Sequence, residues 1–174
     1  TISFADALRM VPGLQVARIN SLEYAISARG LNDATSSKLL VLMDGRSVYN
    51  RLLSGANWGY QSVFLPDVHR IEVMRGPGAS LWGVNAVNGV INVVTQNAHD
   101  TLGSLITVGY GDESSSLLRA RYGWKMSDRL AARVYTQVEH RDGLLEEGGL
   151  YDEWTSTLAG LRADWHRSAG GGLS

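Results

Sequence analysis

The sequence contains no cysteine, no long apolar run and no excess of charge of either sign. Without cysteine the chain cannot form disulfides, thiolate metal sites or a thiol nucleophile. No window approaches the ~18 apolar residues that a membrane-crossing helix needs. Sixteen Lys and Arg residues against seventeen Asp and Glu residues leave a formal charge of -1. That balance gives no electrostatic footprint for nucleic acid.

The chain has 174 residues, which is enough for one ordinary domain and part of a second. It starts at Thr1 with neither an initiator Met nor the basic and then apolar segment of a secretory leader. We therefore expect Thr1 to be an interior position of a longer or processed product.

Up to Asn97 the pattern is that of a small mixed domain of strands and short helices. Apolar residues at helical spacing in "SFADALRMV" precede Pro12-Gly13, which predicts a short helix and its end. The segments "LQVARI" and "EYAISARG" have the composition of short strands that close in turns. In "KLLVLMDGRSVY", Asp44-Gly45 lies between two β-rich runs, and this predicts a hairpin of residues 39–43 with residues 46–49.

A glycine-rich bend between "RIEVMR" and "GVINVVT" has the look of a phosphate-binding loop. A Walker loop requires Lys and then Ser or Thr after its last glycine, whereas Val84-Asn85 follow Gly83 here. Too few residues separate Gly78 from the next strand, near Val90, for the crossover helix of a dinucleotide-binding unit. We therefore interpret the bend as structural, with one helical turn over residues 79–82.

From Thr101 onward, four segments of about ten residues alternate apolar and polar side chains. In "LLRARYGWK", for example, Leu118 and Tyr122 share one face. Arg119 and Arg121 share the other. The same period of two occurs in "LITVGYG", "LAARVYTQVEH" and "LAGLRADWH". These segments predict four β-strands, because successive side chains of a strand point to opposite faces.

Two structures fit this alternation: a half-exposed antiparallel sheet of a soluble protein, and the wall of a transmembrane β-barrel. Each segment has the ~9–11 residues that a tilted strand needs to cross a bilayer. Charges lie in mid-strand on the polar faces, and the connections alternate between the short "KMSDR" and the long acidic "RDGLLEEGGLYDE". Aromatic residues gather near the strand ends, as in the girdles of outer-membrane barrels: Tyr110, Trp124, Tyr151, Trp154 and Trp165.

Four motifs follow one another along the chain: "VPGLQV", "SARG", "VLMDGRSVY" and "PDVHRIEVMRGPGASLWGVNAVNGVINVVTQ". Together they resemble the plug domain of TonB-dependent outer-membrane receptors, and the tail from Thr101 resembles the first strands of the barrel that follows the plug in this family. The resemblance implies an α+β fold with a small mixed-sheet plug domain in residues 1–97. Residues 98–174 are then the first about four antiparallel strands of a transmembrane β-barrel, which is incomplete in this chain.

The resemblance implies active uptake across the outer membrane of a Gram-negative bacterium. The implied ligand is a scarce metal chelate, first a ferric siderophore, with cobalamin, haem or another large solute as alternatives. The implied partners are outer-membrane lipid and the TonB energy-transducing protein, which pulls on a TonB box that these residues lack. Such transport makes and breaks no bond, so the resemblance implies neither an enzyme nor a cofactor.

Two arginines match a contact known in the family. Arg29 in "SARG" and Arg75 in "MRGP" correspond to plug arginines that pair with barrel glutamates in some relatives. The resemblance therefore implies that they form a latch between plug and barrel. Charge-assisted contacts suit a plug that must hold and yet move. The alternative is that each arginine binds only plug carbonyl groups near its own turn.

The loops after "SARG" and "DGRSVY" correspond to apical plug loops in the family. Aromatic residues together with an arginine suit a flat, anionic or partly aromatic chelate. The alternative is that Trp58 and Tyr60 only pack their loop against the barrel wall. The residues nominated to face the ligand are Asn32, Tyr49, Asn50, Arg51, Asn57, Trp58 and Tyr60.

No motif of a catalytic or metal site is present, and we predict neither. The histidines are scattered, without an i,i+4 pair or an HExxH motif: His69, His99, His140 and His166.

Four strands cannot close a barrel, and an open edge in lipid leaves backbone groups without hydrogen bonds. We therefore expect the chain to be a fragment of a receptor. The alternative is a free-standing, plug-like binding module in the periplasm.

Overall fold

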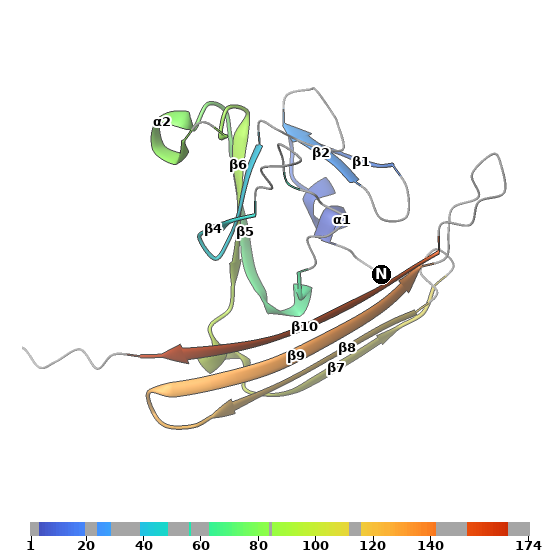
Figure 1. Cartoon of the computed structure of the whole chain (residues 1–174), viewed down its shortest axis with the longest axis vertical. Coiled ribbons are helices and arrows are strands. Elements are labelled where there is room, and N and C mark those ends of the chain that lie inside the picture. Colours follow the sequence, from blue (N-terminus) through green and yellow to red (C-terminus); the bar gives the residue numbers. More distant parts are fainter. Residues whose placement is uncertain are drawn as a thin grey trace, which may run out of the picture.

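A computed structural model describes residues 4–19, 24–28, 39–48, 56, 63–83, 85–111, 116–141 and 153–166. A small body of short helices and strands lies above a long four-stranded sheet (Figure 1). The elements of the small body are α1 Phe4–Arg9, β1 Leu14–Arg18, β2 Tyr24–Ala28, β3 Leu39–Met43, β4 Arg46–Ser47, η1 Leu65–Asp67, β5 Val68–Arg75, α2 Ala79–Trp82 and β6 Gly89–Thr95. The link and the long sheet consist of η2 Ala98–Thr101, β7 Gly103–Gly109, β8 Ser116–Lys125, β9 Leu130–Arg141 and β10 Trp154–Trp165.

The first helix and the two strands after it fold as predicted. α1 buries Phe4 and Leu8. The chain turns after α1 at Gly13, whose φ of 83° is a left-handed conformation that glycine adopts without strain. β1 and β2 then pair antiparallel along their whole length. The helical spacing of the apolar residues and the Pro12-Gly13 stop therefore predict α1 and its end correctly.

The central sheet has the strand order β4-β3-β6-β5. The predicted hairpin is confirmed, since β3 and β4 pair antiparallel around Asp44 and Gly45, with φ of 48° and 77°. Positive φ at both central residues is typical of a type I′ turn, for which Asp-Gly is favoured. β3 also pairs with β6 in parallel, beginning with Leu39 opposite Gly89. No local signal predicts that pair, because it joins segments fifty residues apart.

The glycine-rich bend is structural, as predicted. β5 and β6 pair antiparallel, and α2 makes one helical turn in the bend between them. At Gly89 a Cβ atom would lie 2.5 Å from the carbonyl oxygen of Met74, so only glycine lets the two strands approach this closely. An antiparallel hairpin is incompatible with the parallel βαβ unit of nucleotide-binding folds.

The hydrophobic core lies between α1, the β1–β2 pair and one face of the central sheet. Burial of aliphatic side chains such as these contributes about 1.5–3 kcal/mol each. The most deeply buried are Leu8, Ile26, Leu39, Ile91 and Val93. A smaller cluster on the other face consists of Leu40, Leu42, Ala86 and Val90. Because β3 and β6 are buried on both faces, they are continuous apolar runs and do not alternate.

The long sheet is an antiparallel meander in the order β10-β9-β8-β7, and the four predicted strands are confirmed. Burial alternates residue by residue, but in the sense opposite to that of a soluble protein. Ile106 and Val108 are 74% and 76% exposed, whereas Arg133 is 2% exposed. In β7–β10, all of which the structure describes, every Asp, Glu, Lys and Arg occupies an inward position. An outer face without Asp, Glu, Lys or Arg, on which aliphatic and aromatic side chains outnumber the Ser, Thr and His residues, fits contact with lipid.

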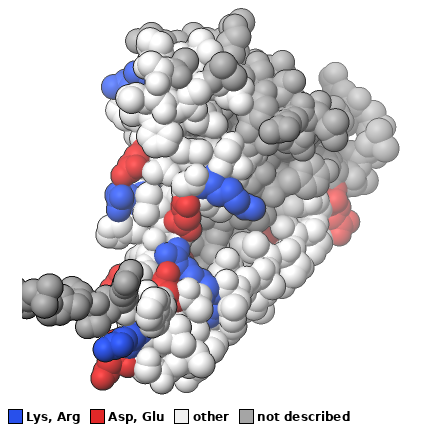
Figure 2. Space-filling view, turned by 60° about the vertical axis from the view of Figure 1, so that its left-hand side comes forward, with Lys and Arg blue, Asp and Glu red and all other residues white. Residues whose placement is uncertain are grey.

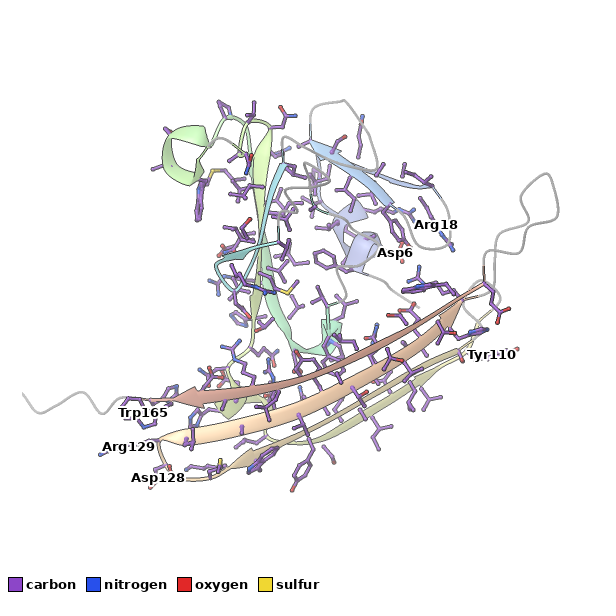
Figure 3. All side chains as sticks on the ribbon, viewed as in Figure 1. Asp6, Arg18, Tyr110, Asp128, Arg129 and Trp165 are labelled. Carbon is purple, nitrogen blue, oxygen red and sulfur yellow. The ribbon has the colours of Figure 1, made fainter. Side chains whose placement is uncertain are left out.

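Aromatic residues lie near the ends of the long sheet. Tyr110 and Trp165 mark its opposite ends (Figure 3). Tyr122 and Trp124 stack with ring centroids 6.0 Å apart, close to the end of β8. In the turn that follows, Lys125 donates to Asp128 at 2.7 Å, which holds the pKa of that carboxyl below its usual range. Among the described residues, no helix has the length and apolar character to cross a membrane.

We expect Val134→Arg to cost about 2–4 kcal/mol of folding free energy in a bilayer, because Val134 lies on the exposed apolar face near the middle of β9. The matched control is Ser156→Arg, which places the same side chain on the inner face of β10 and should cost less. Urea titration of the complete receptor, refolded into phospholipid vesicles, measures both costs. Equal costs would contradict a lipid-facing outer surface.

Candidate functional site

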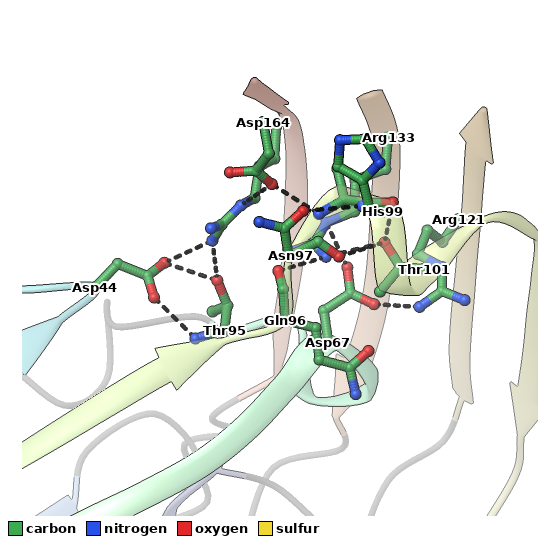
Figure 4. Close-up of polar contacts among 12 residues, drawn as sticks. Asp44, Asp67, Thr95, Gln96, Asn97, His99, Thr101, Arg121, Arg133 and Asp164 are labelled. Carbon is green, nitrogen blue, oxygen red and sulfur yellow. Dashed lines mark hydrogen bonds and ion pairs between the residues drawn. The ribbon is translucent and has the colours of Figure 1, made fainter. Parts of the chain in front are cut away.

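The small body meets the inner face of β7–β10, which we call the wall, through charged side chains (Figure 4). Asp67, the last residue of η1, is 1% exposed. Its Oδ1 accepts a 2.5 Å hydrogen bond from Nη1 of Arg121 on β8, and its Oδ2 lies 2.9 Å from Nε of Arg133 on β9. The second contact is an ion pair without the alignment of a hydrogen bond. We call these three residues the Asp67 clamp.

Backbone contacts fix Asp67 in this position. Pro66 sets the φ of the short helix. The N–H of Asp67 donates to the carbonyl oxygen of Phe64 at 3.0 Å, and its own carbonyl accepts from the N–H of Gln96 at 2.7 Å. The Phe64 ring also packs on that of Tyr135 in β9, with centroids 5.0 Å apart. The carboxylate is therefore positioned by the chain on both sides of it as well as by the arginines.

Arg133 also binds the link that joins the small body to the wall. Its Nη1 donates to the carbonyl oxygen of Gln96 at 2.9 Å and to Oγ1 of Thr101 at 3.1 Å. β8 approaches this link at Gly123, where a Cβ atom would collide with the carbonyl oxygen of Thr101. Glycine is thus required for the close approach. The clamp therefore holds the carboxylate and the link against the same two strands.

A second set of contacts, at the β10 edge, is more exposed. Arg162 donates from Nε to Oδ2 of Asp164 at 2.7 Å. Its Nη1 donates to Oγ1 of Thr95 at 2.5 Å and to Oδ2 of Asp44 at 3.3 Å. Asp44 also accepts from the N–H and the hydroxyl of Thr95, and Asp164 accepts from the N–H of Ala98 at 2.7 Å. The hairpin turn of the small body is thus connected to the wall through Arg162.

A third set lies toward the other end of β9. Nη1 of Arg141 donates to the hydroxyl of Tyr24 on β2 at 2.8 Å, and its Nε donates to Glu139 at 2.8 Å. Arg119 of β8 donates to the side-chain oxygen of Gln137 at 2.7 Å. In all three sets the wall arginines are the donors, and the groups of the small body that they reach are acceptors.

The contact between the two bodies is polar and hollowed. A cavity of about 500 Å³ lies between the central sheet and the β10 side of the wall. Its lining mixes polar residues, among them Asp44 and Thr95, with apolar ones, among them Phe64 and Leu158. Figure 2 shows basic and acidic groups alternating along the seam between the small body and the strands. Such a contact fixes geometry through charge-assisted bonds and does not depend on a continuous apolar interface.

A metal centre is not apparent in the described part of the chain, where no group of three or more His, Asp or Glu residues could hold an ion. The fold does bring two of the scattered histidines together: His99 and His166 stack with centroids 4.2 Å apart and planes within 13°. Because these two histidines are far apart in the sequence, the sequence analysis did not predict that they stack. Parallel stacked rings direct their nitrogens side by side, so the pair does not converge on one ion.

Of the site residues nominated from the sequence, the structure describes only Arg75. Its Nη1 donates to the carbonyl oxygen of Pro12 at 3.0 Å and so connects the end of β5 to the turn after α1. At Gly13 a Cβ atom would lie 2.7 Å from that nitrogen. The others lie outside the described residues: Arg29, Asn32, Tyr49, Asn50, Arg51, Asn57, Trp58 and Tyr60.

The sequence analysis missed the clamp and the contacts of Arg162. The available signal was the set of arginines at inward positions of the alternating strands, which indicated a polar face but no partner for it. Asp67 in "PDVHRIEV" had no feature that distinguished it from the other acidic residues.

The fold and this contact define a class of protein: a small α+β plug docked on the charged inner face of strands whose outer face is apolar, as in plugged barrels of bacterial outer membranes. Residues 1–90 match the TonB-dependent Receptor Plug Domain. The chain belongs to that family, whose members are transport receptors and not enzymes.

Curated relatives agree with this assignment. The vitamin B12 transporter BtuB of Vibrio vulnificus strain CMCP6 is 33% identical over 114 residues, which cover 64% of this chain and 18% of that protein. BtuB of strain YJ016 is 31% identical over 138 residues, or 79% of this chain and 22% of that protein. The chain therefore spans about a fifth of the length of these relatives.

Solved structures share the fold. The ferric yersiniabactin uptake receptor FyuA of Yersinia pestis has a TM-score of 0.64 at 24% identity, over 91% of this chain and 25% of that one. The siderophore receptor PirA of Pseudomonas aeruginosa has a TM-score of 0.61 at 22% identity, over 95% of this chain and 28% of that one. At these identities the similarity is one of fold, and the α+β small body with the first strands of the wall is the shared architecture.

We expect Asp67→Asn to destabilise the docked plug by about 3–5 kcal/mol, because it leaves two arginines, 10% and 2% exposed, without a buried counter-charge. The matched control is Asp44→Asn, for which we expect about 1 kcal/mol or less, since Arg162 is 29% exposed and keeps Asp164. Urea titration followed by tryptophan fluorescence measures both changes. A loss for Asp67→Asn no greater than that of the control would show that the clamp does not stabilise docking.

Proposed function

We propose that the protein is a TonB-dependent outer-membrane transporter that takes up a scarce metal chelate, first of all a ferric siderophore. In this proposal residues 1–97 are its plug, residues 98–174 are its first barrel strands, and the remainder of the barrel belongs to a longer chain. The plug closes the barrel lumen at rest, and its displacement opens a path for the substrate.

The observation that supports this proposal best is the Asp67 clamp. A buried carboxylate on the plug meets two arginines on a wall whose opposite face is uncharged and apolar. This arrangement suits a plug inside a lumen that is surrounded by lipid. It also argues against a free-standing periplasmic module, because a soluble sheet would expose Ile106, Val108 and Leu161 to water.

The substrate has two candidates. A ferric siderophore is supported by the two receptors of similar structure, which are named for siderophore uptake. Cobalamin is supported by the 33% identity to a vitamin B12 transporter. The plug motifs behind both similarities are common to receptors for different chelates, so uptake itself has to distinguish the two.

Location and partners follow from the same proposal. The strands β7–β10 contact lipid of the outer membrane of a Gram-negative bacterium, and the periplasmic side of the plug is pulled by TonB. We also propose a latch role for Arg29 and Arg75 against barrel carboxylates. For Arg75, the bond to Pro12 uses one of its five N–H donors and leaves others for such a partner.

The uptake experiment uses a bacterial strain that lacks its own receptors and expresses the complete gene. We expect energy-dependent accumulation of a ⁵⁵Fe-labelled ferric siderophore, and none of ⁵⁷Co-labelled cobalamin. A tonB deletion is the control, because it removes the energy for plug movement and leaves binding intact. Accumulation of cobalamin alone would replace the first candidate with the second, and accumulation of neither chelate would refute the proposed function.

In the same strain, variants of the nominated plug residues should separate binding from plug movement. We expect Arg51→Ala with Trp58→Ala to weaken chelate binding about tenfold or more, because stacking and charge are lost together. Arg29→Ala with Arg75→Ala should leave binding intact and change the rate of uptake. Equilibrium binding to whole cells at 0 °C and uptake at 37 °C measure the two. If either pair behaves like the unaltered receptor, its assigned role is wrong.

A further inference from the structure

The wall has an excess of positive charge that its own carboxylates do not balance. The inward positions of β8, β9 and β10 hold five arginines against two carboxylates, with Lys125 at the end of β8 paired to Asp128 in the turn. The five are Arg119, Arg121, Arg133, Arg141 and Arg162. The two carboxylates are Glu139 and Asp164. Three positive charges on these strands therefore depend on something other than the wall.

The pairing of the strands arranges four of the arginines in successive rows along the length of the sheet. Arg133 lies opposite Arg162, and Arg121 follows two residues further along the sheet, opposite Tyr135. Arg119 comes two residues beyond that, opposite Gln137. Successive rows are about 7 Å apart, at ~3.4 Å per residue.

The last arginine extends this series to the far end of β9. Arg141 is eight residues from Arg133 on the same strand, which corresponds to about 27 Å of strand. The series, which we call the arginine ladder, therefore extends along about 20 Å of the ~30 Å hydrocarbon thickness, because barrel strands are tilted by about 35–45°.

At rest the plug supplies oxygen atoms to this ladder. Carboxylates of Asp67 and Asp44 meet three of the arginines, and Thr95 and Gln96 offer further oxygens to Arg162 and Arg133. The hydroxyl of Tyr24 accepts from Arg141. Part of the charge on the wall is therefore covered by acceptors that belong to the plug, in addition to the wall carboxylates Glu139 and Asp164.

Arg119 is the exception. It is 8% exposed and donates to Gln137 of the wall itself, and within the described residues no plug oxygen contacts it. Among the residues that the structure describes, no carboxylate contacts its guanidinium directly, and a buried cation in that state is costly unless an anion reaches it.

Displacement of the plug would remove the Asp67 carboxylate from Arg121 and Arg133, and would leave Arg162 and Arg141 with the wall carboxylates Asp164 and Glu139. A buried guanidinium that loses its partner carries a large penalty, whereas exchange of one oxygen acceptor for another carries little. A chelate that presents anionic carboxylate or catecholate oxygens can take the vacated donors as the plug releases them, and Arg suits planar oxygen pairs through two parallel N–H bonds. A cationic or purely neutral solute without such oxygens gains nothing from the ladder.

We propose that the arginine ladder is an anion-binding track, along which an anionic chelate takes over the donors that the plug oxygens occupy at rest. The proposal rests on the proposed transport function and narrows its substrate to an oxygen-rich anion. In this proposal the inner face of the wall contributes to substrate selection by charge, in addition to the ligand-facing loops of the plug.

The first test measures ion selectivity and does not need a known substrate. The complete receptor is inserted into a planar bilayer, urea is added to displace the plug, and the reversal potential is read under a tenfold KCl gradient. We expect Arg119→Gln to lower the ratio of Cl⁻ to K⁺ permeability about threefold, the effect of one kT of local potential, and Arg119→Lys to keep it. The control Arg70→Gln changes an exposed arginine on the plug, paired with Glu72, and should leave the ratio unchanged.

The second test compares chelates that differ in charge. In the uptake strain, Arg119→Gln should slow accumulation of an anionic ferric tris-catecholate about threefold or more, and leave a neutral ferric trihydroxamate unchanged. Equal effects of Arg119→Gln on the uptake of both chelates would contradict the proposed anion-binding track. An unaltered permeability ratio in the bilayer would also contradict it. If the unaltered receptor accumulates neither chelate, the proposed function fails, while the bilayer measurement still decides whether the ladder selects anions.

Discussion

Charge buried between the plug and the wall is the constraint on which the rest of this structure depends. Asp67 is almost fully buried, and so is Arg133, which contacts both the carboxylate and the link to β7. Neither group is stable there without the other, because each would be a desolvated charge without a partner. A few directional contacts therefore determine the orientation of the plug. Gly123, which has no side chain, lets β8 come close to the link, where a Cβ atom would collide with Thr101.

The same constraint explains why the two faces of the long sheet differ. Arginines on the inner face require hydrogen-bond acceptors, and the plug supplies several of them. Lipid chains offer no such acceptors, so this face cannot be in contact with lipid. Most of the outer face consists of aliphatic and aromatic residues that need no hydrogen-bond partner in a bilayer. A plug held by polar contacts around a hollow can separate from the wall without exposing a large apolar surface, which suits the movement that the proposed transport requires.

Local structure was largely predictable because it depends on neighbouring residues. Asp44-Gly45 specified a type I′ turn, the Gly76 to Gly89 bend specified an antiparallel connection, and alternation specified β7–β10. The inversion of burial in those strands was predicted only through their length, girdle aromatics and family resemblance. The nominated arginine Arg75 binds a carbonyl of the plug itself, whereas the charged contacts between plug and wall involve Asp67 and Asp44, which the sequence analysis did not select.

The sequence by itself determined most of the elements, the two faces of β7–β10, and the family. All three depend on local order: turn residues, a period of two, and motifs in a fixed succession. Tertiary structure alone decided the parallel pairing of β3 with β6 and the partners of each wall arginine. Asp67 and Arg121 are 54 residues apart, and Asp44 and Arg162 are 118 apart. Coulomb attraction and hydrogen bonding act over a few ångströms of space regardless of position in the chain, so only folding reveals which charges meet.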